Sequence, residues 1–255
     1  MKFPRASGIL LHPTSLPGQF GIGDFGAEAF EFVDFLAGAK QTHWQILPLN
    51  PTGYGDSPYQ CFSVFAGNTL LISPGELLED GLLSKQDLEE KPDFTGDKVD
   101  YGRVFDWKEK ILAAAFQNFS EKPEPNFQRE FEVFQQHNWF WLDDYALYRA
   151  LRKNRNQKSW LEWEESLRFR DETALQNARQ EFSEEIMAQK FYQFLFFRQW
   201  FALKNYAGEK GIKFIGDVPI FVSFDSADVW CNQTKFKLNE DGSPRVVAGV
   251  PPDYF

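Results

Sequence analysis

The sequence contains few cysteine and histidine residues, and this scarcity excludes several kinds of site. Its two cysteines, Cys61 and Cys231, lie 170 residues apart, so we expect neither a disulfide framework nor a Cys-x-x-Cys metal site. The three histidines form no His-x-His or His-Glu-x-x-His pattern and no Cys/His quartet, which argues against a transition-metal site. We therefore expect no metal and no cofactor. The cysteine content suits a reducing compartment, and we expect a cytoplasmic protein.

Long apolar runs and an excess of basic side chains are also absent. No stretch approaches the roughly 18 apolar residues of a membrane span, and the first residues, MKFP, resemble no targeting leader. The 27 basic and 37 acidic side chains give a net charge of −10, so neither nucleic acid nor a membrane surface is an expected partner. No P-loop occurs. Gly21–Gly26 (GIGDFG) fits a dinucleotide fingerprint weakly, because a long loop separates it from the preceding strand.

Aromatic side chains, by contrast, are abundant. The chain has 28 Phe, 8 Trp and 8 Tyr, which make up 17% of its residues. Apolar residues at 43% and charged residues at 25% are ordinary for a globular protein and exclude a disordered or collagen-like chain. The Phe and Trp stripes of positions 126–163 are more typical of helix–helix packing than of a ligand site.

Three short apolar runs bounded by turn residues predict buried strands. They are Gly8–Leu11, Trp44–Leu49 and Lys213–Val222. Pro219 makes the far half of the third run irregular, because proline has no N–H for a ladder hydrogen bond. A helix joins the first two runs, so they form a parallel strand–helix–strand unit, which indicates an α/β fold.

The helical pattern is clear in both crossovers between the strands. In the first, Phe25, Ala29, Phe32, Val33 and Leu36 form a core-facing stripe, with Asp24 as the expected N-cap and Gly38 as the end. In the second, helices are expected at Asp106–Phe119, Asn126–Gln136, Trp139–Lys153 and Glu184–Ala207. The last has Ser183 as its expected cap, and its expected core residues are Met187, Phe191, Phe194, Leu195 and Phe201.

The length of the second crossover suggests three parts. Residues 1–69 carry the first two strands, 70–180 form an inserted helical subdomain, and 181–255 return to the third strand. Thr234–Leu238 and Arg245–Val250 then flank a glycine-bearing turn and predict a β-hairpin. Three parallel strands with open edges make a poor free-standing sheet, whereas a closed (β/α)₈ TIM barrel has eight. We therefore expect an incomplete barrel, whose remaining half lies outside this chain or is supplied by something else.

Polar residues follow the second and third strands, where an α/β barrel places its site. The loop Asn50–Gln60 combines two tyrosines with an aspartate and a serine, a composition suited to sugars, although a turn-rich surface loop with a tyrosine anchor explains it equally well. Asp217 ends an apolar strand, where a carboxylate is costly to bury, and it serves either a site or the next loop. Asp225 and Asp228 are expected to be helix caps, and His12 can form a hydrogen bond in the site.

Five segments, spread in order along the chain, carry a family resemblance. They are LLHPTSLPG (Leu10–Gly18), GIGDFG (Gly21–Gly26), WQILPLNPTGYGDSPYQ (Trp44–Gln60), GDVPIFV (Gly216–Val222) and VVAGVPPDYF (Val246–Phe255). Together they closely resemble the amylomaltases, the 4-α-glucanotransferases of the α-amylase clan. The resemblance implies a (β/α)₈ barrel with inserted helical subdomains. It also implies a retaining transfer of an α-1,4-glucan segment to the 4-hydroxyl of another glucan or glucose.

The same resemblance suggests roles for individual residues. Tyr59 resembles the tyrosine that stacks on the sugar beside the cleaved bond, with Ser57 next to it, and Asp217 resembles the aspartate that supports that subsite. Two further pairs complete the expected substrate-binding set: Tyr54 and Tyr101 in a secondary glucan groove, and Tyr254 and Phe255 at the start of a loop over the donor sugars.

No catalytic residue is expected in this chain. The family's nucleophilic aspartate lies in an RIDH-type motif and its stabilising aspartate in an HDN-type motif, with a glutamate as acid/base, and neither motif occurs here. An α-glucan hydrolase, a non-catalytic glucan-binding module and a helical interaction protein built on residues 70–180 remain alternatives.

Overall fold

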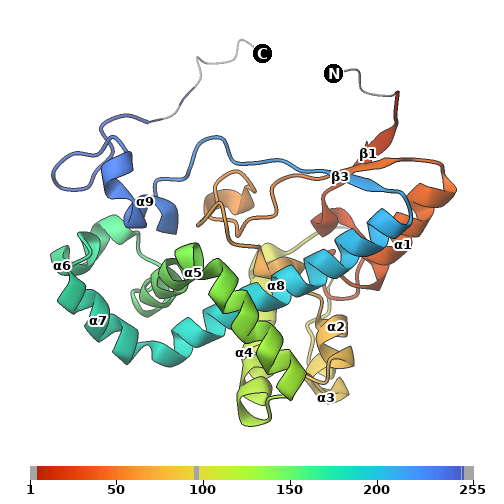
Figure 1. Cartoon of the computed structure of the whole chain (residues 1–255), viewed down its shortest axis with the longest axis horizontal. Coiled ribbons are helices and arrows are strands. Elements are labelled where there is room, and N and C mark those ends of the chain that lie inside the picture. Colours follow the sequence, from red (N-terminus) through yellow and green to blue (C-terminus); the bar gives the residue numbers. More distant parts are fainter. Residues whose placement is uncertain (1–4, 95–97, 248, 250–255) are drawn as a thin grey trace.

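Three short parallel strands form the sheet of this chain. The computed structural model describes residues 5–94, 98–247 and 249 (Figure 1). Strands β1 (Gly8–Leu10), β2 (His43–Gln45) and β3 (Lys213–Ile215) lie in the order β1-β2-β3, with both pairs parallel. The predicted parallel α/β arrangement is therefore confirmed for these three strands.

Each strand is shorter than the apolar run that predicted it. Beyond β2, Ile46 N still donates to Ile215 O at 2.9 Å, but Pro48 follows two residues later and has no N–H to continue the ladder. The segment after β3 leaves the sheet at Gly216, before Pro219. The carboxyl ends of both strands therefore open directly into loops.

One face of the sheet is covered by two helices, α1 (Ala27–Gly38) and α8 (Ser183–Glu209). Trp44 is fully buried, with its ring centroid 4.8 Å from Phe32 of α1 and 5.0 Å from Phe214. Phe214 in turn lies 4.7 Å from Trp200 of α8. Because side chains alternate along a strand, Leu10 and Ile215 point to the opposite face, where they are 57% and 45% exposed.

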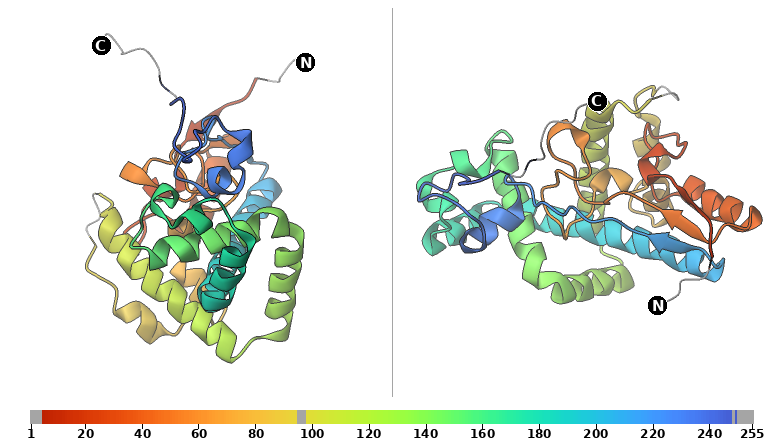
Figure 2. Two further views of the ribbon diagram at one scale, coloured as in Figure 1. Left: turned by 90° about the vertical axis from the view of Figure 1, so that its left-hand side faces the viewer. Right: turned by 90° about the horizontal axis from the view of Figure 1, so that it is seen from above.

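Helix α8 runs through the whole molecule. Figure 1 shows it extending from α7 at one end to α1 and β3 at the other, and Figure 2 shows it beside the strands from above. It contacts α1, α4, α5, α7 and β3.

The other helices are α2 (Pro74–Glu79), α3 (Lys85–Glu89), α4 (Tyr101–Glu121), α5 (Pro125–Asn154), α6 (Glu165–Arg168), α7 (Glu172–Glu181) and α9 (Ala227–Cys231). Short 3₁₀ turns occur at η1 (Pro13–Ser15), η2 (Tyr54–Asp56), η3 (Thr69–Leu71), η4 (Trp160–Glu162) and η5 (Gln233–Lys235). Within the described residues, no helix has the length and apolarity required to cross a membrane.

The aromatic excess fills two cores between these helices. Around α8, the stacked rings of Phe119 and Phe191 lie 4.6 Å apart, and Phe127 and Phe131 close the same cluster from α5. A second cluster gathers buried aromatic rings under α9: Tyr148, Trp160, Trp163 and Trp230. The interpretation of the Phe and Trp stripes as packing surfaces agrees with this arrangement for most of these residues, but Trp139 and Phe140 are 67% and 58% exposed.

Several predicted helix details were wrong. The two helices expected at Asn126–Gln136 and Trp139–Lys153 are one continuous helix, α5, because the residues between them include neither glycine nor proline. Asp24 does not cap α1, whose N-cap is Gly26, and Ser183 does not cap α8, whose N-cap is Phe182. Of the residues expected to face the core from α8, Met187 and Phe201 are exposed by 39% and 50%.

The hairpin predicted after β3 is not confirmed. Its first segment begins in the 3₁₀ turn η5, and a single antiparallel bridge joins Leu238 and Pro244. Arg245 N donates to Lys237 O at 2.8 Å, but the second segment extends to positions outside the described residues. Pro244 cannot donate to a ladder, and the described structure has no second strand here.

Asp24 instead belongs to a buried ion pair that ties α4 to the loop before α1. Lys108 of α4 is 2% exposed, and its Nζ lies 3.2 Å from Asp24 Oδ2. The same ammonium donates to Leu70 O at 2.6 Å and to Ile72 O at 2.8 Å. All three of its protons therefore have acceptors, which is the condition for burying a lysine.

Replacement of this lysine is expected to destabilise the fold strongly. Lys108→Met removes the cation beside the buried Asp24 carboxylate, which keeps its bond from Gly26 N at Oδ1, and leaves two carbonyls without a donor. The free energy of unfolding should therefore fall by about 3–5 kcal/mol in urea denaturation. Adding Asp24→Asn should recover part of the loss. Arg179→Gln, which breaks the exposed pair with Glu172, is the control and should cost less than about 1 kcal/mol. A Lys108→Met loss no larger than that of the control would contradict this prediction.

Candidate functional site

The candidate site lies where the carboxyl ends of β2 and β3 open into loops. Tyr59, in the loop after β2, donates its hydroxyl to Asp217 Oδ2 at 2.8 Å, although the two residues are 158 positions apart. Asp217 Oδ1 accepts from Val218 N at 2.8 Å. Two residues predicted for one site are therefore in direct contact. The bond to the Asp217 carboxylate raises the pKa of Tyr59 above its usual value, because ionisation would place a phenolate beside that carboxylate.

The loop that carries Tyr59 is a closed structure, here called the tyrosine loop (residues 51–62). Gly53 N donates to Gln60 O at 2.7 Å, and Phe62 N donates to Pro51 O at 3.0 Å, so the two limbs face each other. Its tip passes through the left-handed region at Gly55 and Asp56 (φ 69° and 54°), which reverses the chain.

The loop brings Ser57 next to Tyr59, as predicted. Ser57 Oγ accepts from Tyr59 N at 3.4 Å, so the serine supports the backbone of the tyrosine. The side chain of Tyr54, and Tyr254 and Phe255 entirely, lie outside the described part of the structure. Their predicted roles stay predictions.

An open groove of about 1060 Å³ begins at the Tyr59–Asp217 pair. Its wall continues along the segment after Asp217, where Ile220 and Phe221 are 84% and 68% exposed, and along Val247. Tyr59 itself is 45% exposed. The groove thus combines apolar surface with a fixed carboxylate, the two kinds of contact that a sugar ring uses.

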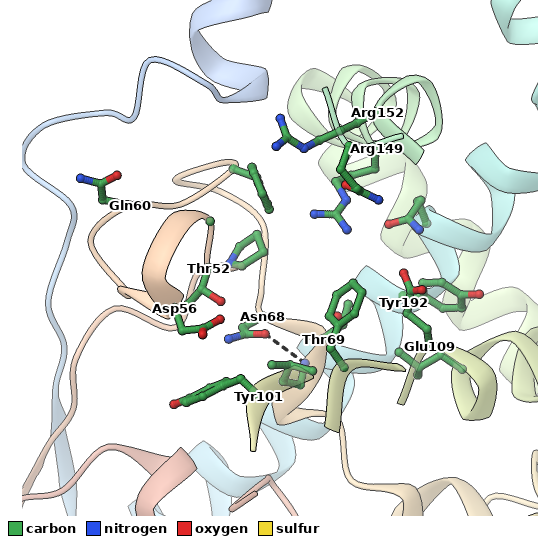
Figure 3. A pocket seen from close by; sticks show the side chains of 18 of the residues that line it. Thr52, Asp56, Gln60, Asn68, Thr69, Tyr101, Glu109, Arg149, Arg152 and Tyr192 are labelled. Atoms are coloured by element: carbon green, nitrogen blue, oxygen red, sulfur yellow. Dashed lines mark hydrogen bonds between the residues drawn. The ribbon is translucent and has the colours of Figure 1, made fainter. Parts of the chain in front are cut away.

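A second cleft of about 650 Å³ lies on the other side of the tyrosine loop (Figure 3). Tyr101, the first residue of α4, lies at one end of it, and Arg149 and Arg152 of α5 lie at the other (Figure 3). Gln60 and Asp225 line both cavities, so the loop is the wall between them. Tyr101 is therefore separated from the Tyr59–Asp217 pair by this wall.

The two arginines were not predicted. Their guanidinium groups lie 5.0 Å (Arg149) and 4.6 Å (Arg152) from the ring centroid of Phe62. Spaced three residues apart on a helix, they carry no motif, and only the i, i+3 spacing indicates that they share a face.

Asp225 and Asp228 were predicted to be helix caps, and this was wrong. The cap of α9 is Ser226, whose hydroxyl accepts from Val229 N at 3.3 Å. Asp225 forms an ion pair with Arg152 and accepts from Tyr148 Oη at 3.2 Å. Asp225 therefore pairs with the buried Arg152 and does not cap the start of α9.

Asp228 binds the residues directly after the tyrosine loop and not the start of its own helix. It accepts from Val64 N at 2.8 Å and from Ser63 Oγ at 3.4 Å. The carboxylate thereby ties α9 to the residues that follow the loop. Burial raises the pKa of Asp228, and the bond from Val64 N opposes that rise.

His12 does not form the predicted side-chain hydrogen bond within the described structure. Its Nδ1 is buried with no partner there, and desolvation lowers the pKa of His12 to about 4. Among the described residues, no group of three or more His, Cys, Asp or Glu side chains is placed to hold a metal ion.

These features define an α/β protein with its candidate site at the carboxyl edge of a parallel sheet. Comparison with known proteins makes the assignment more specific. Residues 11–255 match the 4-alpha-glucanotransferase family, glycoside hydrolase family 77. The chain belongs to this family.

Curated relatives cover the whole chain. It is 50% identical over 255 residues to the 4-alpha-glucanotransferase of Thermus thermophilus and 47% identical over 252 residues to that of Synechocystis. The match covers 100% and 98% of this chain but 50% of each relative. The chain therefore spans about half the length of these relatives.

A solved structure supports the same relationship. The amylomaltase from Streptococcus agalactiae in complex with acarbose superposes with a TM-score of 0.94 at 44% identity, covering 99% of this chain and 51% of that one. The amylomaltase from Corynebacterium glutamicum, at 20% identity and a TM-score of 0.71, shares the fold.

The partly buried His12 predicts a pH dependence of stability. Because the pKa of His12 is about 4 in the folded chain, against an ordinary value of 6.5 for a solvated histidine, the unfolded state binds the proton first as pH falls. Stability should therefore decrease from pH 6.5 towards pH 4, by up to about 3 kcal/mol from this residue.

Urea denaturation between pH 7 and 5 can isolate this effect. His12→Gln should flatten the slope of stability against pH, whereas His137→Gln, at an exposed position, should leave it unchanged. Equal slopes for wild type and His12→Gln would contradict the assignment.

Proposed function

We propose that this chain is the glucan-binding half of a 4-alpha-glucanotransferase. The reaction cleaves an α-1,4-glucan and transfers the released segment, with retention, to the 4-hydroxyl of another glucan or glucose. The observation that carries the proposal is the Tyr59–Asp217 contact beside an open groove, in a chain that belongs to this family. The acarbose complex of the Streptococcus agalactiae relative supports glucans as substrates.

In this proposal Tyr59 and Asp217 bind one sugar between them. The exposed ring of Tyr59 packs against the apolar C–H face of the sugar. A carboxylate has about four lone-pair positions, and Asp217 uses one on each oxygen for Tyr59 and Val218 N, so it retains acceptor capacity for sugar hydroxyls. Ser57 holds the backbone of Tyr59 in place.

The second cleft extends the proposal to a secondary glucan groove. Tyr101 is one of the aromatic residues that line it, and Tyr54 is assigned to it by resemblance. Tyr254 and Phe255 are assigned to a loop over the donor sugars, where exclusion of water favours transfer over hydrolysis. No role in proton transfer is assigned to any residue of this chain.

The expected partner of this chain is the second half of the barrel, and its expected location is the cytoplasm. The catalytic carboxylates belong to the second half of the barrel, because the family motifs that carry them are absent from these 255 residues. That half is the expected partner of this one. A cytoplasmic location agrees with two free cysteines, of which Cys61 is buried.

Binding of maltoheptaose tests the site. In calorimetry, Tyr59→Ala should weaken binding about tenfold, corresponding to about 1.4 kcal/mol, because the ring surface is lost. Tyr59→Phe and Asp217→Asn should weaken it less, because the ring remains. Tyr206→Phe is the matched control, since Tyr206 also donates to an aspartate, Asp34, at 2.8 Å, but on α8 away from the groove. Absence of binding by the wild-type chain, or equal loss in the control, would contradict the proposal.

Incubation with maltotriose tests whether this chain lacks transferase activity on its own. The chain alone is expected to produce neither glucose nor longer maltodextrins above a control without protein, because it lacks the catalytic carboxylates. Chromatography of the products measures this. Formation of both products by the purified chain would overturn the assignment of catalysis to the other half.

A further inference from the structure

Segment 66–73 crosses the buried side of α8, and two glutamines of that helix supply hydrogen-bond partners to its backbone. Gln193 and Gln199 are 0% and 4% exposed. The amide of Gln193 accepts from Gly67 N at 2.7 Å and donates to Gly67 O at 3.0 Å. The amide of Gln199 does the same with Ser73, at 2.7 and 3.2 Å. Each glutamine thus reproduces the pair of hydrogen bonds that two facing residues exchange in an antiparallel sheet.

The spacing of the two contacts fixes the segment along α8. The two glutamines are six positions apart, which corresponds to a rise of about 9 Å along a helix. Six extended residues would span about 20 Å, more than twice that rise. The 3₁₀ turn η3 lies between Gly67 and Ser73 and shortens the path, so that both glutamines reach their partners.

Gly67 is held from two sides. A Cβ atom at this position would lie 2.0 Å from Cδ1 of Phe196, so the backbone rests directly on that ring. Gln193 binds both polar groups of the same residue. The ring blocks movement towards the helix, and the amide opposes movement away from it.

Gly67 also sits at the base of the tyrosine loop. On its two sides, Asn50 Nδ2 donates to Ala66 O at 3.0 Å, and Asn68 N donates to Leu49 O at 2.8 Å. These two bonds join the residues just before the loop to the segment that follows it. Fixing Gly67 therefore fixes the base from which the limb bearing Tyr59 extends.

The same helix also leads to Asp217, the second residue of the Tyr59–Asp217 pair. Helix α8 ends at Glu209 and continues through a short turn into β3, which ends two residues before Asp217. We infer that Gln193 is a positioning residue, which sets the Tyr59–Asp217 geometry by fixing the tyrosine loop to the helix that carries Asp217. The inference rests on the proposed function where it concerns glucan binding.

Affinity for maltoheptaose tests this role on the full 255-residue chain. Gln193→Leu should weaken binding about tenfold, whereas Gln199→Leu should change it less than about twofold. The control is matched, because each variant removes one buried amide and an equivalent pair of bonds to one backbone residue, Gly67 or Ser73. In a Tyr59→Ala background, which has already lost the ring that the loop positions, Gln193→Leu should add less than about twofold. Equal weakening by the two glutamine variants, or an undiminished effect in the Tyr59→Ala background, would overturn the inference.

Hydrogen exchange without glucan separates this inference from the proposed function. The Gly53 and Phe62 amides, which close the tyrosine loop, should exchange faster in Gln193→Leu than in Gln199→Leu. If the wild-type chain binds no maltoheptaose, the proposed function fails, while the exchange result still decides whether Gln193 holds the loop. Equal exchange in both variants would reject that role.

Asn50→Ser is a milder variant should Gln193→Leu fail to fold. It removes the partly buried bond to Ala66 O and leaves both glutamines in place. It should speed exchange of the Gly53 and Phe62 amides without altering that of Ser73 N, which Gln199 holds. Unchanged exchange of the Gly53 and Phe62 amides would contradict the inference that the bonds at the base of the loop stabilise the rest of it.

Discussion

Buried backbone outside helices and strands must find hydrogen-bond partners, and in this molecule side chains from α4 and α8 provide them. Lys108 binds the carbonyls of Leu70 and Ile72, and Gln193 and Gln199 bind Gly67 and Ser73. The segment between the tyrosine loop and α2 is thereby fixed to two helices at once. The position of Tyr59 and the packing of the helices both depend on these bonds.

The abundance of aromatic residues serves the same architecture. Helix α8 has neighbours along its whole length, and flat rings allow several helices to approach it closely. Phe191 contacts the rings of Phe119, Phe127 and Phe131, which come from α4 and α5. A polar side chain can be buried in this interior when its hydrogen-bonding groups have partners, as those of Gln193 do.

Much of the fold could be predicted from the sequence, because apolar periodicity and turn residues are local signals. The three strands, their parallel order and the helix ending at Gly38 were predicted correctly. The strand lengths were not predicted correctly, because ladder hydrogen bonds end where neighbouring segments diverge. The continuity of α5 was missed, although no glycine or proline separates its two predicted halves.

The candidate site was predictable to a smaller extent. The contact of Tyr59 with Asp217 follows from the rule that parallel strands end at one edge, combined with the family resemblance. Arg149 and Gln193 could not be found in this way. Their roles depend on partners far away in sequence, and an arginine or glutamine on a helix is ordinarily a surface residue. Asp225 was misjudged for the same reason, since its partner Arg152 lies 73 positions earlier.

The 158 residues between Tyr59 and Asp217 have a consequence for how the chain folds. Closing so long a loop carries an entropic cost, which is lowered once the intervening residues have become compact. Of the helices between β2 and α8, α4, α5 and α7 contact α8, and α5 does so most extensively, so packing against α8 makes these intervening residues compact. The Tyr59–Asp217 contact, and with it the groove, requires that the chain has returned to the sheet through α8 and β3.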